Sequence, residues 1–267
     1  MSPNRIIAIV LRQIYLIRGS FSRVFPTFAW IAVDMVLWGF LTRYLNKATS
    51  GGPDFVPILL GAVLLWDFFI RIMQGVTMAF FEDVWSRNFL NVFATPILIS
   101  EYVGGLILSS IVTSAIGLAV MLCIAAVFFH LSLLVYGIMT IPFLAVLFLF
   151  GIALGIFACA VVLRFGPASE WFIWPLPALI SPFAGVLYPI STLPEWMRYI
   201  SVIFPPSYVF EGLRAMVSGS AVQTAALVKG GLLAVAYIVA AYYILNRVYR
   251  HALRTGLIAR YSAETIS

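Results

Sequence analysis

The sequence predicts an all-α membrane protein with six transmembrane helices. Of its 267 residues, 63% are apolar and only 10% are charged, whereas soluble domains are about half apolar and a quarter charged. So few charged side chains cannot form the polar surface that a soluble chain of this length needs. In addition, apolar stretches of about 20 residues, the length that crosses about 30 Å of hydrocarbon, recur six times.

The segment at residues 4–19, ahead of the first span, has an amphipathic pattern. Arg5 and Arg12 are seven residues apart and lie on nearly the same helical face. Apolar residues lie on another face, namely Ile6, Val10, Ile14 and Ile17. The pattern predicts a helix along the inner membrane surface, with its arginines at anionic head groups. An ordinary flanking segment without a defined helix is the alternative.

Arginines in the first two dozen residues argue against a cleavable signal peptide, so the first span is expected to remain in the mature protein. The six predicted spans are 24–45, 55–80, 102–129, 136–163, 171–189 and 223–246, and residues 1–267 form a single transmembrane domain. Cytoplasmic loops retain Lys and Arg. Most of the 16 such residues lie on one side of the membrane if the N- and C-termini are both cytoplasmic. That side holds Arg5, Arg12, Arg18, Arg23, Arg87, Arg164, Arg247, Arg250, Arg254 and Arg260.

Three ionisable residues fall inside the predicted spans, where charges are costly and are therefore candidates for function. Asp34 lies in the first span. Asp67 and Arg71 are four residues apart on one face of the second span and are expected to pair. The functional interpretation is a polar lining or a lock between subunits. The structural alternative is an internal pair that orients the second span.

The residues of a catalytic or nucleotide-binding site are missing from the sequence. The two histidines, His130 and His251, fall at opposite sides of the predicted membrane, which argues against a histidine-based metal site or triad. The two lysines, Lys47 and Lys229, precede Ala and Gly, so no phosphate-binding loop ending in Lys-Ser or Lys-Thr exists. We therefore expect a chain without catalysis, cofactor or metal, and without nucleic acid as a partner.

Residues 82–100 form the longest polar insertion on the predicted inner side. A short amphipathic helix is expected from Asn88 to Phe93, and Thr95-Pro96 should end it. The segment is expected to be where a soluble partner binds, and a surface linker helix is the alternative. Its candidate contact residues are Glu82, Asp83, Trp85, Arg87, Asn88, Phe89, Leu90, Asn91, Val92 and Phe93.

Residues 190–214, on the predicted outer side, are rich in proline. Leu193-Pro194-Glu195-Trp196 predicts a helix start, and Pro205-Pro206 should end that helix after about three turns. Such a helix is too short to span, so it is expected to enter the outer leaflet and return, sheltered by protein. An external loop with one surface helix is the alternative. The candidate gate residues are Leu193, Pro194, Trp196, Pro205, Pro206, Tyr208, Glu211 and Arg214.

Three motifs in this order resemble the membrane subunits of type-2 ABC (ABC-2 type) export permeases. They are Thr95-Pro96 followed by Glu101 and Gly104-Gly105, the Leu193-Pro194-Glu195-Trp196 segment, and Pro205-Pro206 followed by Glu211 and Arg214. The resemblance covers nearly the whole chain in length and span order. It implies an N-terminal interface helix, a coupling helix at 82–100 that docks in a groove of a separate ATPase, and re-entrant helices on the outer side.

The resemblance also implies partners and a location. They are two copies of a cytosolic ATP-binding-cassette ATPase that carries ATP and magnesium, a second copy of this chain or a related permease, and the lipids of a bacterial inner (plasma) membrane. The expected substrate is a polysaccharide, lipid or drug for export. An ion-coupled secondary transporter and a membrane scaffold are the alternatives, although the sequence lacks the several facing acids or the internal repeat expected of a carrier.

The chain departs from the family pattern in the coupling segment. Many members carry Gly-Thr-Leu-Glu before the coupling leucines, where Arg87 to Asn91 here include neither glycine nor acid. Docking is therefore expected to rest on the apolar side chains Phe89, Leu90, Val92 and Phe93.

Overall fold

The computed structural model describes residues 2–19, 21–49, 55–86, 88–131 and 137–256. Within these ranges the chain is helical and contains no strand. Its elements are α1 (Pro3–Arg18), α2 (Phe21–Ala48), the π-helical turn η1 (Val56–Leu60), α3 (Gly61–Trp85), α4 (Phe89–Ala94), α5 (Ile99–Phe129), α6 (Thr140–Phe165), the 3₁₀ helix η3 (Pro167–Phe172), α7 (Leu176–Ala184), the 3₁₀ turn η4 (Ile190–Thr192), α8 (Glu195–Ser201), α9 (Pro205–Val217) and α10 (Thr224–Thr255).

Four helical segments in the described ranges are long and apolar enough to cross a membrane. They are Val56–Trp85, Ile99–Phe129, Gly137–Phe165 and Thr224–Thr255, and they coincide with the predicted second, third, fourth and sixth spans. The protein is therefore a multi-pass membrane protein. The predicted first span lies within α2, which is 28 residues long but is not one of these four.

The expectation of one continuous helix at 171–189 is wrong. This stretch contains the end of η3 and then α7, which has only 9 residues, about 14 Å of helix. Prolines recur through it at Pro175, Pro177 and Pro182, and each removes a backbone donor that a regular helix needs. Gly185, with φ 66°, then ends α7 in the left-handed conformation that glycine favours.

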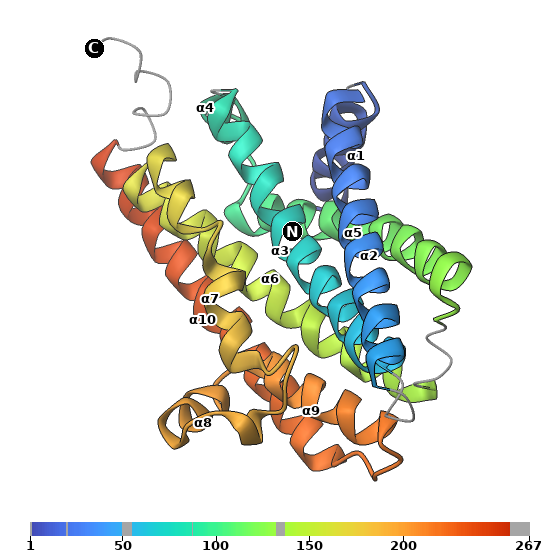
Figure 1. Ribbon diagram of the computed structural model, residues 1–267. Coiled ribbons are helices and arrows are strands. Elements are labelled where there is room, and N and C mark those ends of the chain that lie inside the picture. The colour runs from blue at the N-terminus through green and yellow to red at the C-terminus, as the bar shows by residue number, and fades with distance from the viewer. Residues whose placement is uncertain (1, 20, 50–54, 87, 132–136, 257–267) are drawn as a thin grey trace.

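Helix α3 lies in the middle of the bundle, where it packs against α5 and α6, while α10 covers α6 (Figure 1). The α3–α6 contact is close because α6 has two glycines at it. A Cβ at Gly151 would lie 3.0 Å from Ile72, and one at Gly155 would lie 2.7 Å from Val76. Small residues that let backbones approach in this way are typical of helix contacts within membranes.

The short helices separate to the two ends of the bundle. Figure 1 shows α4 and the C-terminal end of α10 at one end, with α8 and α9 at the opposite end. Helix α8 has 7 residues, about two turns rather than the three expected. Pro205 and Pro206 occupy the first turn of α9, where their missing N–H groups cost nothing. The two prolines therefore begin a helix as well as follow one.

Candidate functional site

The predicted coupling segment forms a turn in which α4 connects α3 to α5. Helix α4 spans Phe89–Ala94, and Thr95 after it is extended, as expected for a residue that precedes proline. Side chains fasten both ends, since Asn91 Nδ2 donates to Asn88 Oδ1 at 3.2 Å and Thr95 Oγ1 donates to the Val92 carbonyl at 2.5 Å. The turn is therefore a defined structure at the end of the bundle.

Phe89 does not lie where the sequence placed it. We expected Phe89 to help dock a partner, but its side chain is fully buried. Its ring centroid lies 5.5 Å from that of Phe80, 4.6 Å from that of Phe93 and 6.3 Å from that of Tyr102. Phe93 in turn lies 5.1 Å from Tyr249 of α10. These aromatic residues anchor α4 to the bundle.

The outward surface of α4 is formed by other residues. Asn91, Ala94, Thr95 and Pro96 are exposed, and the first three lie on one helical face because they are three or four residues apart. The side chains of Arg87 and Leu90 lie outside the described residues. Among the described side chains of α4, Asn91 and Ala94 therefore face outward and Phe89 does not.

Asp83, in the last turn of α3, is a fully buried carboxylate with three donors. Both terminal nitrogens of Arg12 bind it, with Nη1 at 3.1 Å from Oδ2, and Tyr102 donates to Oδ2 at 2.7 Å. A two-pronged arginine contact of this kind fixes orientation as well as distance. Asp83 therefore joins α1, α3 and α5 at one point.

Glu101, in the first turn of α5, makes a second junction with α1. It is 1% exposed and forms an ion pair with Arg5, Nη1 to Oε2, at 3.2 Å. It also accepts from the backbone N–H of Ser2 at 2.6 Å and from that of Leu98 at 3.1 Å. The carboxylate thus caps α5 and holds the start of α1. We call the contacts of Asp83 and Glu101 with α1 the α1 clamp.

The α1 clamp changes the interpretation of the N-terminal helix. Arg5 and Arg12 do share a face, but they bind carboxylates of their own chain rather than lipid head groups. The opposite face is the exposed one, and it carries Ile7, Leu11 and Ile14. Helix α1 is therefore amphipathic with its charged face turned toward the bundle, which leaves apolar side chains for a membrane boundary.

Glycine explains how α1 comes so close to α5. A Cβ at Gly105 would lie 2.6 Å from Cβ of Ile9, whereas one at Gly104 would lie 3.7 Å from Ile6. Ile9 is buried at this contact. The second glycine of the Gly104-Gly105 motif is thus the one on which α1 rests.

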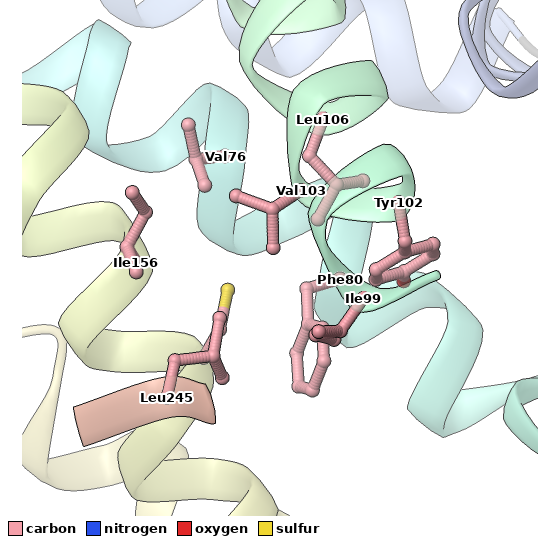
Figure 2. Close-up of a pocket in the computed structure, with 9 residues that line it drawn as sticks. Val76, Phe80, Ile99, Tyr102, Val103, Leu106, Ile156 and Leu245 are labelled. Atoms are coloured by element: carbon pink, nitrogen blue, oxygen red, sulfur yellow. The ribbon is translucent and has the colours of Figure 1, made fainter. Parts of the chain in front are cut away.

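Beyond Tyr102, the site continues into a closed apolar seam between four helices (Figure 2). Phe80 and Tyr102 face side chains of α6 and α10, among them Ile156 and Leu245. The seam is too narrow to admit a water molecule. Its apolar lining residues come from α3, α5, α6 and α10, so these four helices meet at it.

The predicted contact between Asp67 and Arg71 is absent. Ion pairs between described residues occur at Arg5–Glu101, Arg12–Asp83 and Arg214–Glu211. Among the described residues, Asp67 Oδ2, Arg71 Nε and Ser114 Oγ are buried without a hydrogen-bond partner.

The side chain of Arg71, on α3, packs against α5. A Cβ at Gly117 of α5 would lie 3.0 Å from Arg71 Cδ and 3.9 Å from Ile31 of α2. The guanidinium therefore sits where α2, α3 and α5 converge, and Asp34 of α2 and Asp67 of α3 are close enough to interact with it electrostatically. This placement favours the internal role of Arg71 over a lining of the pathway.

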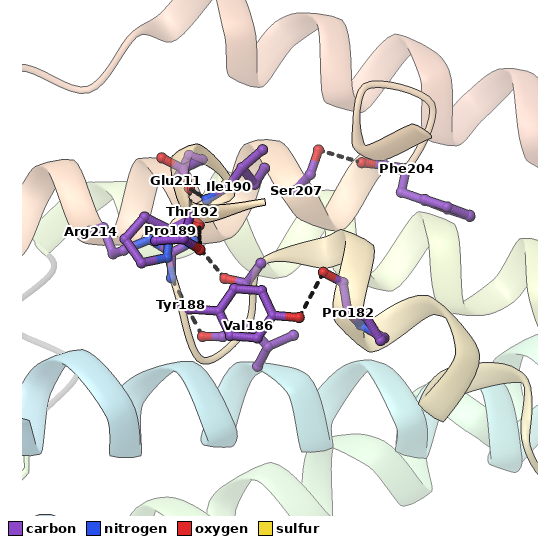
Figure 3. Close-up of polar contacts among 11 residues, drawn as sticks. Pro182, Val186, Tyr188, Pro189, Ile190, Thr192, Phe204, Ser207, Glu211 and Arg214 are labelled. Carbon is purple, nitrogen blue, oxygen red and sulfur yellow. Dashed lines mark hydrogen bonds and ion pairs between the residues drawn. The ribbon is translucent and has the colours of Figure 1, made fainter. Parts of the chain in front are cut away.

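At the opposite end, Glu211 and Arg214 fasten the loop after α7 to α9 (Figure 3). Glu211 accepts from the backbone N–H of Ile190 and from Arg214, each at 2.9 Å, and Arg214 also donates to the carbonyls of Gly185 and Val186. Tyr208 donates to the Val202 carbonyl at 2.8 Å. Leu193 is buried, whereas Trp196 is 61% exposed. Of the predicted gate residues, Glu211 and Arg214 therefore contact each other, whereas Trp196 points to the surface.

Sequence reasoning missed Tyr102 and the partners of Asp83 and Glu101. A signal was present, because two acids flank the polar insertion and two arginines seven residues apart precede the first span. To pair these acids with these arginines, one must know that α1 packs on α5, and hydropathy does not give that packing.

Comparison with known families finds a match to the family model of the ABC-2 type transporter over residues 5–217. The matched region includes α1 from Arg5 onward, the α4 turn and the whole of α9. Comparison with curated proteins finds no match.

Proposed function

Because the chain belongs to the ABC-2 type transporter family and is the transmembrane component of an ABC-type transporter, we propose that it forms the export pathway for an amphiphilic, lipid-linked or glycan substrate and is driven by a separate cytosolic ATPase. The observation that carries the proposal is the α4 turn. It is a short helix at one end of the bundle, with an exposed outer face and an inner face anchored by aromatic side chains.

The proposed mechanism uses this anchoring. ATP binding draws two ATPase subunits together, and each presses on the α4 turn of one permease subunit. The aromatic contacts of Phe89 and Phe93 pass the displacement to Tyr102 and Tyr249, and the apolar seam between the four helices carries it to α6 and α10. Closely packed helices move as rigid bodies, so a small shift at one end becomes a rotation at the other.

The α1 clamp supports the same mechanism. Asp83 and Glu101 lie on the two sides of the α4 turn, and α1 holds both through Arg12 and Arg5. The ends of α3 and α5 therefore cannot separate when α4 is pressed. Without this restraint, the turn would bend rather than move the spans.

The proposed assembly has two permease subunits, either two copies of this chain or this chain with a related one, and two ATPase subunits in a bacterial inner membrane. Each permease subunit would have six membrane segments. Helix α2 provides the first segment, and the interrupted helical stretch from η3 to α7 provides the fifth. The N- and C-termini, α1 and the α4 turn lie on the cytoplasmic side, and α8 and α9 lie outside. The excess of Lys and Arg on the first of these sides supports this orientation.

An experiment on the exposed face of α4 tests the proposal. With a candidate partner ATPase co-expressed, Ala94→Arg should reduce ATPase co-purification by about tenfold or more, because it puts bulk and charge on the docking face. Tyr199→Arg, on the exposed surface of α8, is the matched control and should leave co-purification unchanged. Transport in proteoliposomes should require ATP.

Two outcomes would refute the proposal. Equal ATPase co-purification with both variants would show that α4 is not the docking site. Transport that proceeds without ATP and follows the proton gradient would favour the ion-coupled carrier instead.

A further inference from the structure

A groove of about 290 Å³ lies between the end of α6 and the end of α10. It is lined by Arg164 of α6 and by Tyr243, Ile244, Arg247, Val248 and His251 of α10. Tyr243, Arg247 and His251 are four residues apart, so they stack along one helical face. Arg164 reaches the same hollow from the last turn of the neighbouring helix.

Among the described residues, the lining of the groove is basic and includes no acidic residue. Two arginines and a histidine face it, and the ion pairs between described residues all lie elsewhere. Arg247 Nη1 donates to the hydroxyl of Tyr243 at 3.2 Å, which orients the guanidinium and leaves other N–H groups for a ligand.

Helix ends explain only part of this arrangement. Cations near the C-terminus of a helix interact favourably with its free carbonyls, which accounts for one arginine at the end of α6. Arg247 lies two turns before the end of α10, beyond the reach of that effect. The retention of arginine on the cytoplasmic side accounts for basic residues at this end, and the packing of α6 against α10 brings Arg164 and Arg247 to one hollow.

An exposed apolar stripe on α10 leads into the groove. Leu232, Val235 and Val239 are 68%, 46% and 64% exposed, and their spacing places them on the face that continues to Tyr243 and Arg247. The face thus changes along its length from aliphatic to aromatic to cationic. This sequence of side chains matches an acyl chain, an interfacial region and an anionic head group.

We infer that this groove binds the phosphate of an anionic phospholipid from the cytoplasmic leaflet, with an acyl chain along the Leu232–Val239 stripe. Arginine forks suit phosphate oxygens because they donate two parallel hydrogen bonds. Basic pockets between transmembrane helices on the cytoplasmic side bind such head groups. The inference rests on the proposed orientation, in which these ends of α6 and α10 lie at the cytoplasmic surface, and it does not depend on coupling to an ATPase.

Native mass spectrometry of the purified full chain tests the inference. The chain is presented with equal amounts of phosphatidylglycerol and phosphatidylcholine in detergent, and the bound lipids are counted. Wild type should prefer phosphatidylglycerol, and the double variant R164Q/R247Q should lose about tenfold or more of that preference.

The matched control is R250Q/R254Q. It removes the same charge from exposed positions of the same helix that do not line the groove, so it should keep the preference. R164K/R247K should keep part of it, because lysine retains the charge without the planar fork. Melting temperature is compared for all variants, and R247Q alone replaces the double variant if that one does not fold.

Four results would overturn the inference. One is an equal loss in both glutamine double variants, which would mean diffuse attraction, and another is no preference in wild type. A third is release of the lipid by inorganic phosphate alone, which would mean a soluble ligand. The fourth is loss of ATPase co-purification in R164Q/R247Q with lipid binding intact, which would mean a protein contact.

Discussion

Asp83 and Glu101 place buried carboxylates on either side of the α4 turn, and each is satisfied by donors from α1. A buried carboxylate with its partners in place adds little net stability, but one that loses a partner is strongly destabilising. The geometry of the turn therefore depends on α1 being docked. At this scale, charge in a largely apolar chain serves to position helices.

Arg12→Met should destabilise the chain by about 2 to 3 kcal/mol, because it leaves Asp83 buried with only the Tyr102 hydroxyl as a donor. Melting of the purified chain in detergent measures the change. Arg18→Met, which alters an exposed arginine at the end of the same helix, should have little effect. The double variant R12M/D83N should recover part of the loss, and a simple sum of the two single effects would argue against direct coupling.

Gly105→Ala should weaken docking of α1 by about 1 to 3 kcal/mol, since the new methyl group would lie 2.6 Å from Ile9 Cβ and the helices would have to separate. Gly104→Ala is the neighbouring control, because its methyl group would meet Ile6 at an ordinary 3.7 Å. The comparison of melting temperatures checks the prediction. Identical melting of the two variants would mean that α1 does not rest on Gly105.

At the scale of helices, the structure replaces the expected ion pair within α3 by a cation packed where three helices meet. Arg71 of α3 lies against Gly117 of α5 beside Ile31 of α2. Such a cation can fix the relative rotation of the three helices, because moving any one of them away leaves a charge in hydrocarbon.

Arg71→Leu should therefore reduce the yield of folded, monodisperse chain severalfold, with a loss of stability of about 3 kcal/mol. Size-exclusion chromatography of the membrane extract measures the yield. Arg71→Lys keeps the charge and should retain most of the protein, and the uncharged triple variant D34N/D67N/R71L should recover part of it. Normal yield with reduced transport in the Arg71→Leu variant would instead place the cluster in the pathway.

The two ends of the helix bundle carry different elements. The α4 turn and the basic groove lie toward one end, and α8 and α9 lie at the other (Figure 1). A permease needs this division, because energy enters at one membrane surface and the substrate leaves at the other.

Cysteine labelling tests this polarity. In a Cys123→Ser background, where Cys159 is buried, Tyr199→Cys should react with a membrane-impermeant maleimide added to spheroplasts. Asn91→Cys should react only after the membrane is opened. Both positions are exposed in the structure, so a failure to label would not reflect burial. Reaction of both variants in sealed spheroplasts would refute the six-segment topology.

Four membrane helices and the ABC-2 family were predictable because they depend on properties that are local along the chain. A long apolar segment must satisfy its backbone hydrogen bonds internally, so helices followed from composition and length. The motif Thr95-Pro96 marked the end of α4 correctly, because proline acts on its immediate neighbours. Pro205-Pro206 instead begins α9, and α8 ends at Ser201 before it. The same rule, applied to Pro175, Pro177 and Pro182, would have predicted the break in the fifth segment.

The sequence by itself determined which segments are helical and apolar, and which end carries the basic residues. Only the tertiary structure decided that Phe89 faces inward, that Arg5 and Arg12 bind Asp83 and Glu101, and that Arg71 serves three helices. The physical reason is that a helix exposes several faces with similar side chains in a largely apolar chain. Which face is buried depends on partners far away in sequence and on where a glycine lets them approach.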